Sequence, residues 1–163
     1  MLKILIYFCI VFGMKVVLTT VKKAKVEINA KTVGAINRGF LLLVGFTDGD
    51  DKEIVLKMAK KILALRVFPD EKGLINLSLE DVNGDILSVS QFTLYADAEK
   101  GRRPSFINAL KPAQAEPLYE YFNEVLSSEF GREISTGIFG ADMLVTSEND
   151  GPFTLILDSK ELF

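Results

Sequence analysis

Hydroxyl and amide side chains gather in one stretch of the chain, directly after an apolar run typical of a strand. The stretch is Ser90-Gln91-Phe92-Thr93-Leu94-Tyr95-Ala96-Asp97, and the run before it is Ile86-Leu87-Ser88-Val89. Polar groups at the end of a buried strand cost stability unless they are hydrogen-bonded, and such local conflicts concentrate at functional sites. A strand with one solvated face is the simpler interpretation. A second unusual stretch, Asn149-Asp150-Gly151-Pro152-Phe153-Thr154, favours a functional site.

The amino-acid composition restricts the chemistry available to such a site. The chain contains no histidine, so it has no Ser-His-Asp or Cys-His nucleophile and no histidine metal ligand. Cys9 is the single cysteine, which excludes an intrachain disulfide and a cysteine-rich zinc site and fits a reducing compartment. Any catalysis must come from hydroxyls, carboxylates, lysines, backbone amides, an unseen ion or the substrate itself.

The overall charge argues against a strongly basic nucleic-acid binder. The 163 residues carry a formal net charge of −3, whereas nucleic-acid binding usually goes with a basic balance. A role with nucleic acid must rest on a local patch, and the loop 99–106 offers one in Lys100, Arg102 and Arg103. Three cations in a loop usually form a solvated face. Beside a candidate active strand they can instead bind phosphates.

The first thirteen residues form an apolar segment that we expect to lie outside the working domain. The apolar run Ile4–Phe12 is shorter than the roughly 20 residues that a membrane-spanning helix needs. No small-x-small cleavage pattern follows it. An export signal, an additional strand and an upstream extension before a natural start at Met14 are the three interpretations, and we favour the extension.

Hydrophobic periodicity predicts a single α/β (α+β) domain of mostly antiparallel strands with two main helices. The continuous apolar run Phe40–Phe46 predicts a strand buried on both faces. Helices are expected over 54–65, capped by the aspartates before it, and over 118–130, with Pro117 in its first turn and Gly131 at its end. Strands are expected over 15–21, 25–28, 32–36, 40–46, 66–68, 86–89, 133–136, 143–146 and 153–158.

Four motifs resemble those of a known family. Ser90–Asp97, Lys100–Phe106, Thr136–Ala141 and Asn149–Thr154 occur in the order found in the D-aminoacyl-tRNA deacylases of the bacterial and eukaryotic type. The resemblance runs from Met14 almost to the C-terminus, so we expect an extension over 1–13 and a deacylase domain over 14–163, with a barrel-like arrangement of its sheets. It implies hydrolysis of the ester that joins a D-amino acid, or glycine mischarged on alanine tRNA, to the 3′-terminal adenosine.

The resemblance also implies the setting of the reaction. The family works on aminoacylated tRNA as a cytoplasmic homodimer, with no known cofactor and no metal or membrane in its reaction, and its active sites lie at the subunit interface. By resemblance, Asn149, Gly151 and Pro152 of one subunit form a chiral gate in the active site of the other, with a cis Gly151-Pro152 bond. Both carbonyl oxygens then face the α-carbon of the substrate and leave no room for an L side chain.

The same resemblance assigns the remaining site residues. The backbone N–H groups of Phe92 and Thr93 are the candidate oxyanion donors. Because the chain offers Thr93 no histidine base, we expect the 2′-hydroxyl of the tRNA to assist the reaction. The other assignments are Ser90 and Gln91 to the adenosine, Phe139 and Met143 to the pocket wall, and Lys100, Arg102 and Arg103 to tRNA phosphates. Without the family match, Phe139 and Met143 would be expected to belong to the core.

The chain departs from the family pattern at Thr19-Thr20, where members usually carry Gln-Arg. The resemblance implies that this arginine orients the Gly-Pro carbonyls, so its loss is expected to loosen chiral selection unless Lys22 or Lys23 compensates. A deacylase of relaxed chirality is therefore one alternative function. A catalytically inactive tRNA-binding homologue and a purely structural dimer are the others.

Overall fold

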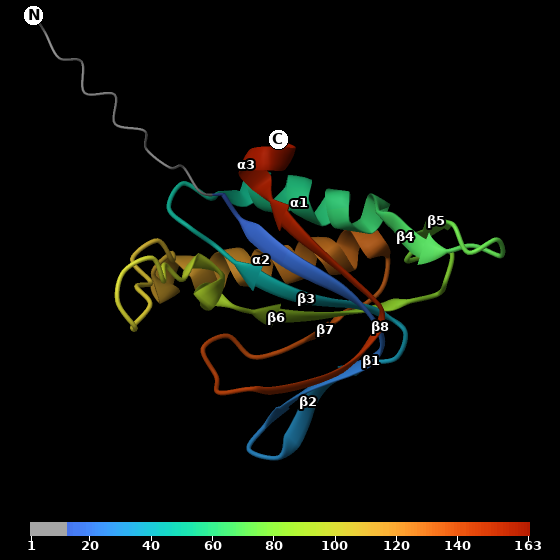
Figure 1. Ribbon diagram of the computed structural model, residues 1–163, viewed down its shortest axis with the longest axis horizontal. Coiled ribbons are helices and arrows are strands. Elements are labelled where there is room, and N and C mark those ends of the chain that lie inside the picture. Colours follow the sequence, from blue (N-terminus) through green and yellow to red (C-terminus); the bar gives the residue numbers. More distant parts are fainter. Residues whose placement is uncertain (1–12) are drawn as a thin grey trace, which may run out of the picture.

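The computed structural model describes residues 13–163, and residues 1–12 of the expected extension lie outside the described residues. The chain forms a six-stranded sheet, a two-stranded sheet and helices (Figure 1). The strands are β1 (Lys15–Ile28), β2 (Lys31–Ile36), β3 (Gly39–Gly45), β4 (Arg66–Pro69), β5 (Ile75–Ser78), β6 (Asp85–Ser90), β7 (Ser135–Thr136) and β8 (Leu144–Asp158). The helices are α1 (Lys52–Ala64), the 3-10 turn η1 (Phe92–Tyr95), α2 (Pro112–Phe130) and α3 (Ser159–Leu162).

The main sheet is organised around β1, the strand with the most neighbours. Its order is β2-β1-β3-β6-β7, with β8 also paired to β1. β1 runs antiparallel to β2, β3 and β8, while β6 runs parallel to both β3 and β7. β4 and β5 form a separate antiparallel hairpin at one end of the molecule (Figure 1). The prediction of a mostly antiparallel, barrel-like sheet with two main helices is confirmed.

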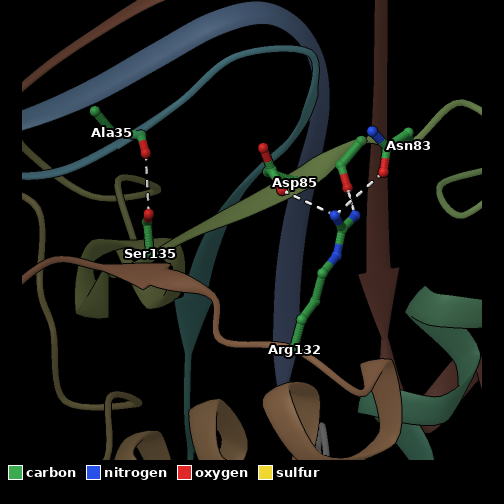
Figure 2. Close-up of polar contacts among 6 residues, drawn as sticks. Ala35, Asn83, Asp85, Arg132 and Ser135 are labelled. Atoms are coloured by element: carbon green, nitrogen blue, oxygen red, sulfur yellow. Dashed lines mark hydrogen bonds and ion pairs between the residues drawn. The ribbon is translucent and has the colours of Figure 1, made fainter.

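The two ends of the sheet order approach each other, which nearly closes the barrel. The Ser135 hydroxyl on β7 donates a hydrogen bond of 3.0 Å to the Ala35 carbonyl oxygen on β2 (Figure 2). A Cβ atom added to Gly34 would lie 2.7 Å from the carbonyl oxygen of Thr136. The backbones of β2 and β7 therefore meet at a position where only glycine leaves enough room.

Two hydrophobic clusters pack on the two faces of this sheet. The larger one fills the space between the sheet and helices α1 and α2, which cover one face (Figure 1). It includes Phe40, Leu42, Met58, Ile62, Ile86, Phe122 and Leu126. The smaller cluster lies on the other face and consists of Val21, Ala24, Val26, Ile36, Leu41, Leu87 and Val89. Neighbouring residues of β3 enter different clusters, so the prediction of a strand buried on both faces is confirmed.

Aspartates before α1 fix its start, as the sequence predicts. The Asp51 side chain is the N-cap and accepts a 2.9 Å hydrogen bond from the backbone N–H of Ile54. The Asp50 carboxylate accepts bonds from the N–H groups of Thr47, at 2.8 Å, and Met14, at 2.9 Å. Burial raises the pKa of Asp50 to about 6, against the lowering effect of these two bonds. Asp50 thereby ties the loop after β3 to the start of β1.

Helix α2 begins earlier than predicted. It starts at Pro112, which occupies the N1 position, so Pro117 lies inside the helix and not in its first turn. Pro117 has no N–H group to donate to the carbonyl oxygen of Ala113. The helix tolerates the loss of this hydrogen bond because Ala113 is an exposed residue in the first turn. The prediction of its end is confirmed, since Gly131 is the C-cap with a left-handed φ of 73°. No helix within residues 13–163 is long and apolar enough to cross a membrane.

An arginine joins the end of α2 to the start of β6. The Arg132 guanidinium lies 3.4 Å from a carboxylate oxygen of Asp85 and also donates to the Gly84 carbonyl oxygen and to the Asn83 side chain (Figure 2). Because β6 leads directly into the polar stretch 90–97, these contacts help fix the strand that carries the candidate site.

Two strands are longer than predicted. β1 is continuous over 14 residues, where strands over 15–21 and 25–28 were expected. Lys22 and Lys23 fall between the two expected strands, but they are exposed residues within a strand whose two halves pair with β3 and β2. β8 likewise joins the expected strands 143–146 and 153–158 into one of 15 residues. Pairing to the long β1 holds both halves in line, and periodicity alone cannot show this.

Candidate active site

The candidate site lies where two parallel strands end together. β3 and β6 are paired up to Val44 and Ser90, and the backbone N–H of Gln91 donates a 2.7 Å hydrogen bond to the Val44 carbonyl oxygen. The polar stretch 90–97 does not continue as a strand, because Phe92–Tyr95 forms the 3-10 turn η1. The polar residues that conflict with a buried strand therefore lie at and beyond its end, where the chain turns into solvent.

The start of η1 leaves backbone donors available. The first hydrogen bonds of the turn run from Leu94 N–H to the Gln91 carbonyl oxygen, at 3.3 Å, and from Ala96 N–H to the Thr93 carbonyl oxygen, at 3.0 Å. The N–H groups of Phe92 and Thr93 precede these bonds, and groups at that position have no partner inside a helical turn. The Gln91 side chain does not cap them. Both residues are exposed at the surface of the chain.

The Thr93 hydroxyl is held by an amide and not by a base. The Gln91 side-chain NH₂ donates to the Thr93 hydroxyl oxygen at 2.5 Å. An amide cannot accept the hydroxyl proton at neutral pH, so this pair lacks the geometry of an activated nucleophile. The pair instead fixes two side chains relative to one another next to the N–H groups of η1.

A pocket of about 620 Å³, here called the site pocket, lies against this strand end. Its lining residues are Val44, Gly45, Phe46, Val89, Ser90, Gln91, Phe92, Phe106, Ala109, Leu110, Lys111, Pro112, Ala115, Phe139, Gly140, Ala141, Met143 and Val145. Five residues predicted for the site, namely Ser90, Gln91, Phe92, Phe139 and Met143, belong to this lining, and Thr93 does not. The wall is mostly apolar, as in sites that bind a small molecule through a few polar groups.

The loop between β7 and β8 supplies one wall of the site pocket. A Cβ atom on Gly137 would lie 2.6 Å from the sulfur of Met143, so glycine allows Met143 to fold back against the loop. The Phe139 ring lies 6.0 Å from the ring of Tyr119, whose hydroxyl donates a 2.8 Å bond to the Ser88 carbonyl oxygen. Burial raises the pKa of Tyr119, so this hydroxyl stays protonated. Phe139 therefore rests on a fixed part of the core.

Gly151 and Pro152 lie on the surface, outside the site pocket of their own chain. Their peptide bond is cis, as predicted. Asn149 pairs with Val21 and Thr154 with Thr19, so residues 150–153 bulge out of β8 opposite Thr20. Gly151, Pro152 and Asn149 are exposed. Within the described chain the predicted gate does not meet the other site residues.

Thr20 contacts the base of this bulge, a role that the sequence did not reveal. Thr20 is 4% exposed, and its hydroxyl donates a 2.7 Å hydrogen bond to the carbonyl oxygen of Asp150. The hydroxyls of Thr19 and Thr154 lie 3.2 Å apart on the next pair of the ladder. Of the two lysines suggested as substitutes for the family arginine, Lys23 pairs with Glu148 at 2.9 Å and Lys22 is exposed.

The basic loop projects beside the site pocket. Paired N–H···O bonds of 2.8 Å between Asp97 and Ser105 close its base. Lys100, Arg102 and Arg103 are exposed and do not line the site pocket. Phe106, which follows the loop, meets Phe92 edge to face with ring centroids 5.1 Å apart. The sequence missed Phe106, the segment 109–112 and Ala115 as pocket residues. Their position depends on a 2.9 Å bond from the N–H of Leu110 to the Phe46 carbonyl oxygen.

Comparison with known proteins gives one consistent result. The profile of a family described as D-Tyr-tRNA(Tyr) deacylase matches residues 17–158. A D-aminoacyl-tRNA deacylase of Lactobacillus acidophilus is 55% identical over 89% of this chain and 99% of its own length. One from Halalkalibacterium halodurans is 53% identical over 90% of this chain and 100% of its own.

Solved structures agree with the fold. A protein described as c-Myc DNA Unwinding Element Binding Protein superimposes with a TM-score of 0.82 at 40% identity, over 88% of this chain and 97% of the other. A probable eukaryotic D-amino acid tRNA deacylase superimposes with a TM-score of 0.78 over 89% of this chain and 98% of its own. At 22% identity, the second likeness concerns the fold alone.

Proposed function

Because the chain belongs to the D-Tyr-tRNA(Tyr) deacylase family and hydrolyses the ester bond of D-aminoacyl-tRNA, we propose that this reaction takes place in the site pocket. The observation that carries the proposal is the coincidence of the pocket lining with the first motif, at Ser90, Gln91 and Phe92. The pocket, of about 620 Å³, falls in the range of about 300–1,000 Å³ usual for small-molecule sites. The pocket binds the aminoacylated adenosine. Ser90 and Gln91 contact the nucleoside, and Phe139 and Met143 form the apolar wall.

In this proposal the ester carbonyl points at the start of η1. The N–H groups of Phe92 and Thr93 donate to the carbonyl oxygen as negative charge develops on it. A single donor of this kind is worth about 3 kcal/mol in other enzymes. Support comes from the exposure of both residues and from the position of their N–H groups ahead of the first bonds of the turn.

The proton transfer is assigned to the substrate. The chain has no histidine, and the Thr93 hydroxyl is bonded to the Gln91 amide. The 2′-hydroxyl of the terminal adenosine, adjacent to the ester, then assists the attack on the carbonyl carbon. A water oxygen adds to this carbon, the bond to the 3′-oxygen breaks, and the 3′-oxygen takes up a proton. The products are free tRNA and the amino acid.

We assign the gate for chirality to a second copy of the chain. The exposure of Asn149, Gly151 and Pro152, and their absence from the pocket of their own chain, support a role in a partner's site. Among the described residues β8 pairs with β1 alone, and it exposes Leu144 (65%) and Ile156 (74%). A long exposed edge strand with apolar side chains is a surface that a partner subunit is expected to cover.

The remaining assignments concern the rest of the tRNA. Lys100, Arg102 and Arg103 bind phosphates next to the acceptor end, supported by their exposure beside Phe106 at the pocket rim. Glycine mischarged on alanine tRNA is also a substrate, because a gate that rejects side chains does not reject a hydrogen atom. We also propose a cytoplasmic location, because the substrate, charged tRNA, is used by translation there.

Hydrolysis of D-tyrosyl-tRNA and L-tyrosyl-tRNA, followed side by side with protein started at Met14 and with the full chain, tests the proposal. We expect rapid loss of the D-ester and a rate for the L-ester close to that without protein. Equal hydrolysis of both esters would contradict the gate. Failure to hydrolyse either would contradict the function itself.

A further inference from the structure

Lys111 is the one ionisable residue among the described residues that line the site pocket. The other seventeen are apolar residues, glycines, Ser90 and Gln91. The Lys111 side chain is exposed and has no ion-pair partner within the described part of the chain. A single cation on an otherwise neutral wall is an electrostatic feature that neither the motifs nor the proposed chemistry uses.

The backbone of Lys111 is anchored on both sides. Its carbonyl oxygen accepts 2.9 Å bonds from the N–H groups of Gln114 and Ala115, and so begins α2. One residue earlier, Leu110 N–H bonds the Phe46 carbonyl oxygen, and Thr47 bonds the Asn108 carbonyl oxygen at 2.6 Å. The Lys111 backbone is therefore fixed to the end of β3, next to the strand that carries Ser90.

The substrate has two charged groups within reach of the pocket. One is the ammonium of the aminoacyl group, and the other is the phosphodiester that links the terminal adenosine to the preceding nucleotide. A lysine attracts the phosphodiester and repels the ammonium. Its position therefore favours one orientation of the substrate, with the phosphate near Lys111 and the amino group away from it.

We propose that Lys111 is a positioning residue that binds the phosphodiester on the 5′ side of the terminal adenosine and thereby orients the ester toward the N–H groups of Phe92 and Thr93. The inference rests on the proposed location of the active site. It concerns a contact distinct from the loop cations Lys100, Arg102 and Arg103, which lie outside the site pocket. Lys111 binds and orients and takes no part in the proton transfer.

Two small substrates isolate this contact. One is adenosine carrying a D-tyrosyl ester at its 3′-oxygen, and the other is the same ester of adenosine 5′-monophosphate. We expect the unmodified enzyme to show a KM about three- to tenfold lower for the phosphorylated ester, as one exposed charge-assisted contact would give. Lys111→Gln should remove this difference and Lys111→Arg should keep it, while kcat for the unphosphorylated ester should change little in either variant.

Full-length substrate and a distant lysine supply the controls. With D-tyrosyl-tRNA, Lys111→Gln should reduce the slope of log(kcat/KM) against log[salt] by about 0.7, the effect of one phosphate contact on a single strand. Lys72→Gln should change nothing, because Lys72 lies in the turn after β4, at the other end of the molecule (Figure 1).

The outcomes separate the inference from the proposed function. If the unmodified enzyme hydrolyses both small esters with equal KM, or if Lys111→Gln impairs both equally, the phosphate contact is wrong and the deacylase site stands. If it hydrolyses D-tyrosyl-tRNA while Lys111→Gln leaves the salt slope and KM unchanged, the inference is also overturned. If the unmodified enzyme hydrolyses none of the three esters, the proposed site and this inference fail together.

Discussion

Thr93 has the hydroxyl group closest in sequence to the proposed oxyanion donors, and its role distinguishes two mechanisms. In the proposed mechanism it positions Gln91 through their 2.5 Å contact and forms no covalent intermediate. Thr93→Ala should then lower kcat for D-tyrosyl-tRNA by about tenfold, which corresponds to one hydrogen bond. Single-turnover hydrolysis measures this, and Thr93→Ser should stay near the unmodified rate. A loss of several orders of magnitude in Thr93→Ala would identify a nucleophile instead.

A second prediction about a single residue concerns Thr20, which lies beside the proposed gate. Its buried hydroxyl bonds the Asp150 carbonyl oxygen directly before Gly151. Thr20→Val keeps the shape and removes this bond, so the free energy of unfolding should fall by about 1 kcal/mol. If the bond also fixes the gate, the ratio of D- to L-tyrosyl-tRNA hydrolysis should fall too.

Denaturant unfolding and the two hydrolysis rates measure these effects separately. Thr20→Ser is the matched control, because it retains the hydroxyl and should retain both properties. A Thr20→Val protein that is less stable but equally selective would show that the bond is structural and does not act on the gate.

At the scale of elements, the contact between β2 and β7 nearly closes the main sheet. Because a Cβ atom on Gly34 would lie 2.7 Å from the Thr136 carbonyl oxygen, Gly34→Ala should force these strands apart. We expect a loss of about 1–3 kcal/mol in the free energy of unfolding, as for other overpacked sites. Urea denaturation measures it. Val33→Ala, at the exposed neighbouring position, should stay within about 0.5 kcal/mol. An equally stable Gly34→Ala protein would contradict the close approach.

At the scale of the whole molecule, the proposed dimer is a condition for activity. Ile156 is 74% exposed on β8. Ile156→Glu should give a folded monomer in light scattering, since its side chain is mostly exposed in the single chain. Hydrolysis of D-tyrosyl-tRNA should be lost with the partner's gate. Leu74→Glu, an equally drastic change at a 63% exposed leucine near β5, should leave the mass and the activity unchanged. A fully active monomeric Ile156→Glu protein would place all catalytic groups in one chain.

The sequence by itself determined several of the elements and the family. Periodicity located the buried strand over 40–46 and helix α1, and Gly131 marked the end of α2. The resemblance of four motifs to those of a known family indicated a D-aminoacyl-tRNA deacylase. These features succeed because they are local: side-chain period, cap and turn chemistry act within a few residues. The polar stretch after β6 was recognised for the same reason, as a local conflict between polar residues and a buried strand.

Tertiary structure decided what depends on residues far apart in the chain. It joined β1 and β8 into long strands through their mutual pairing, and it closed the sheet between Ala35 and Ser135. It brought Phe106 and Lys111 to the pocket through a backbone bond to Phe46, and it placed the Thr20 hydroxyl against Asp150. No local pattern encodes these contacts, because each depends on which backbones lie side by side once the core has packed.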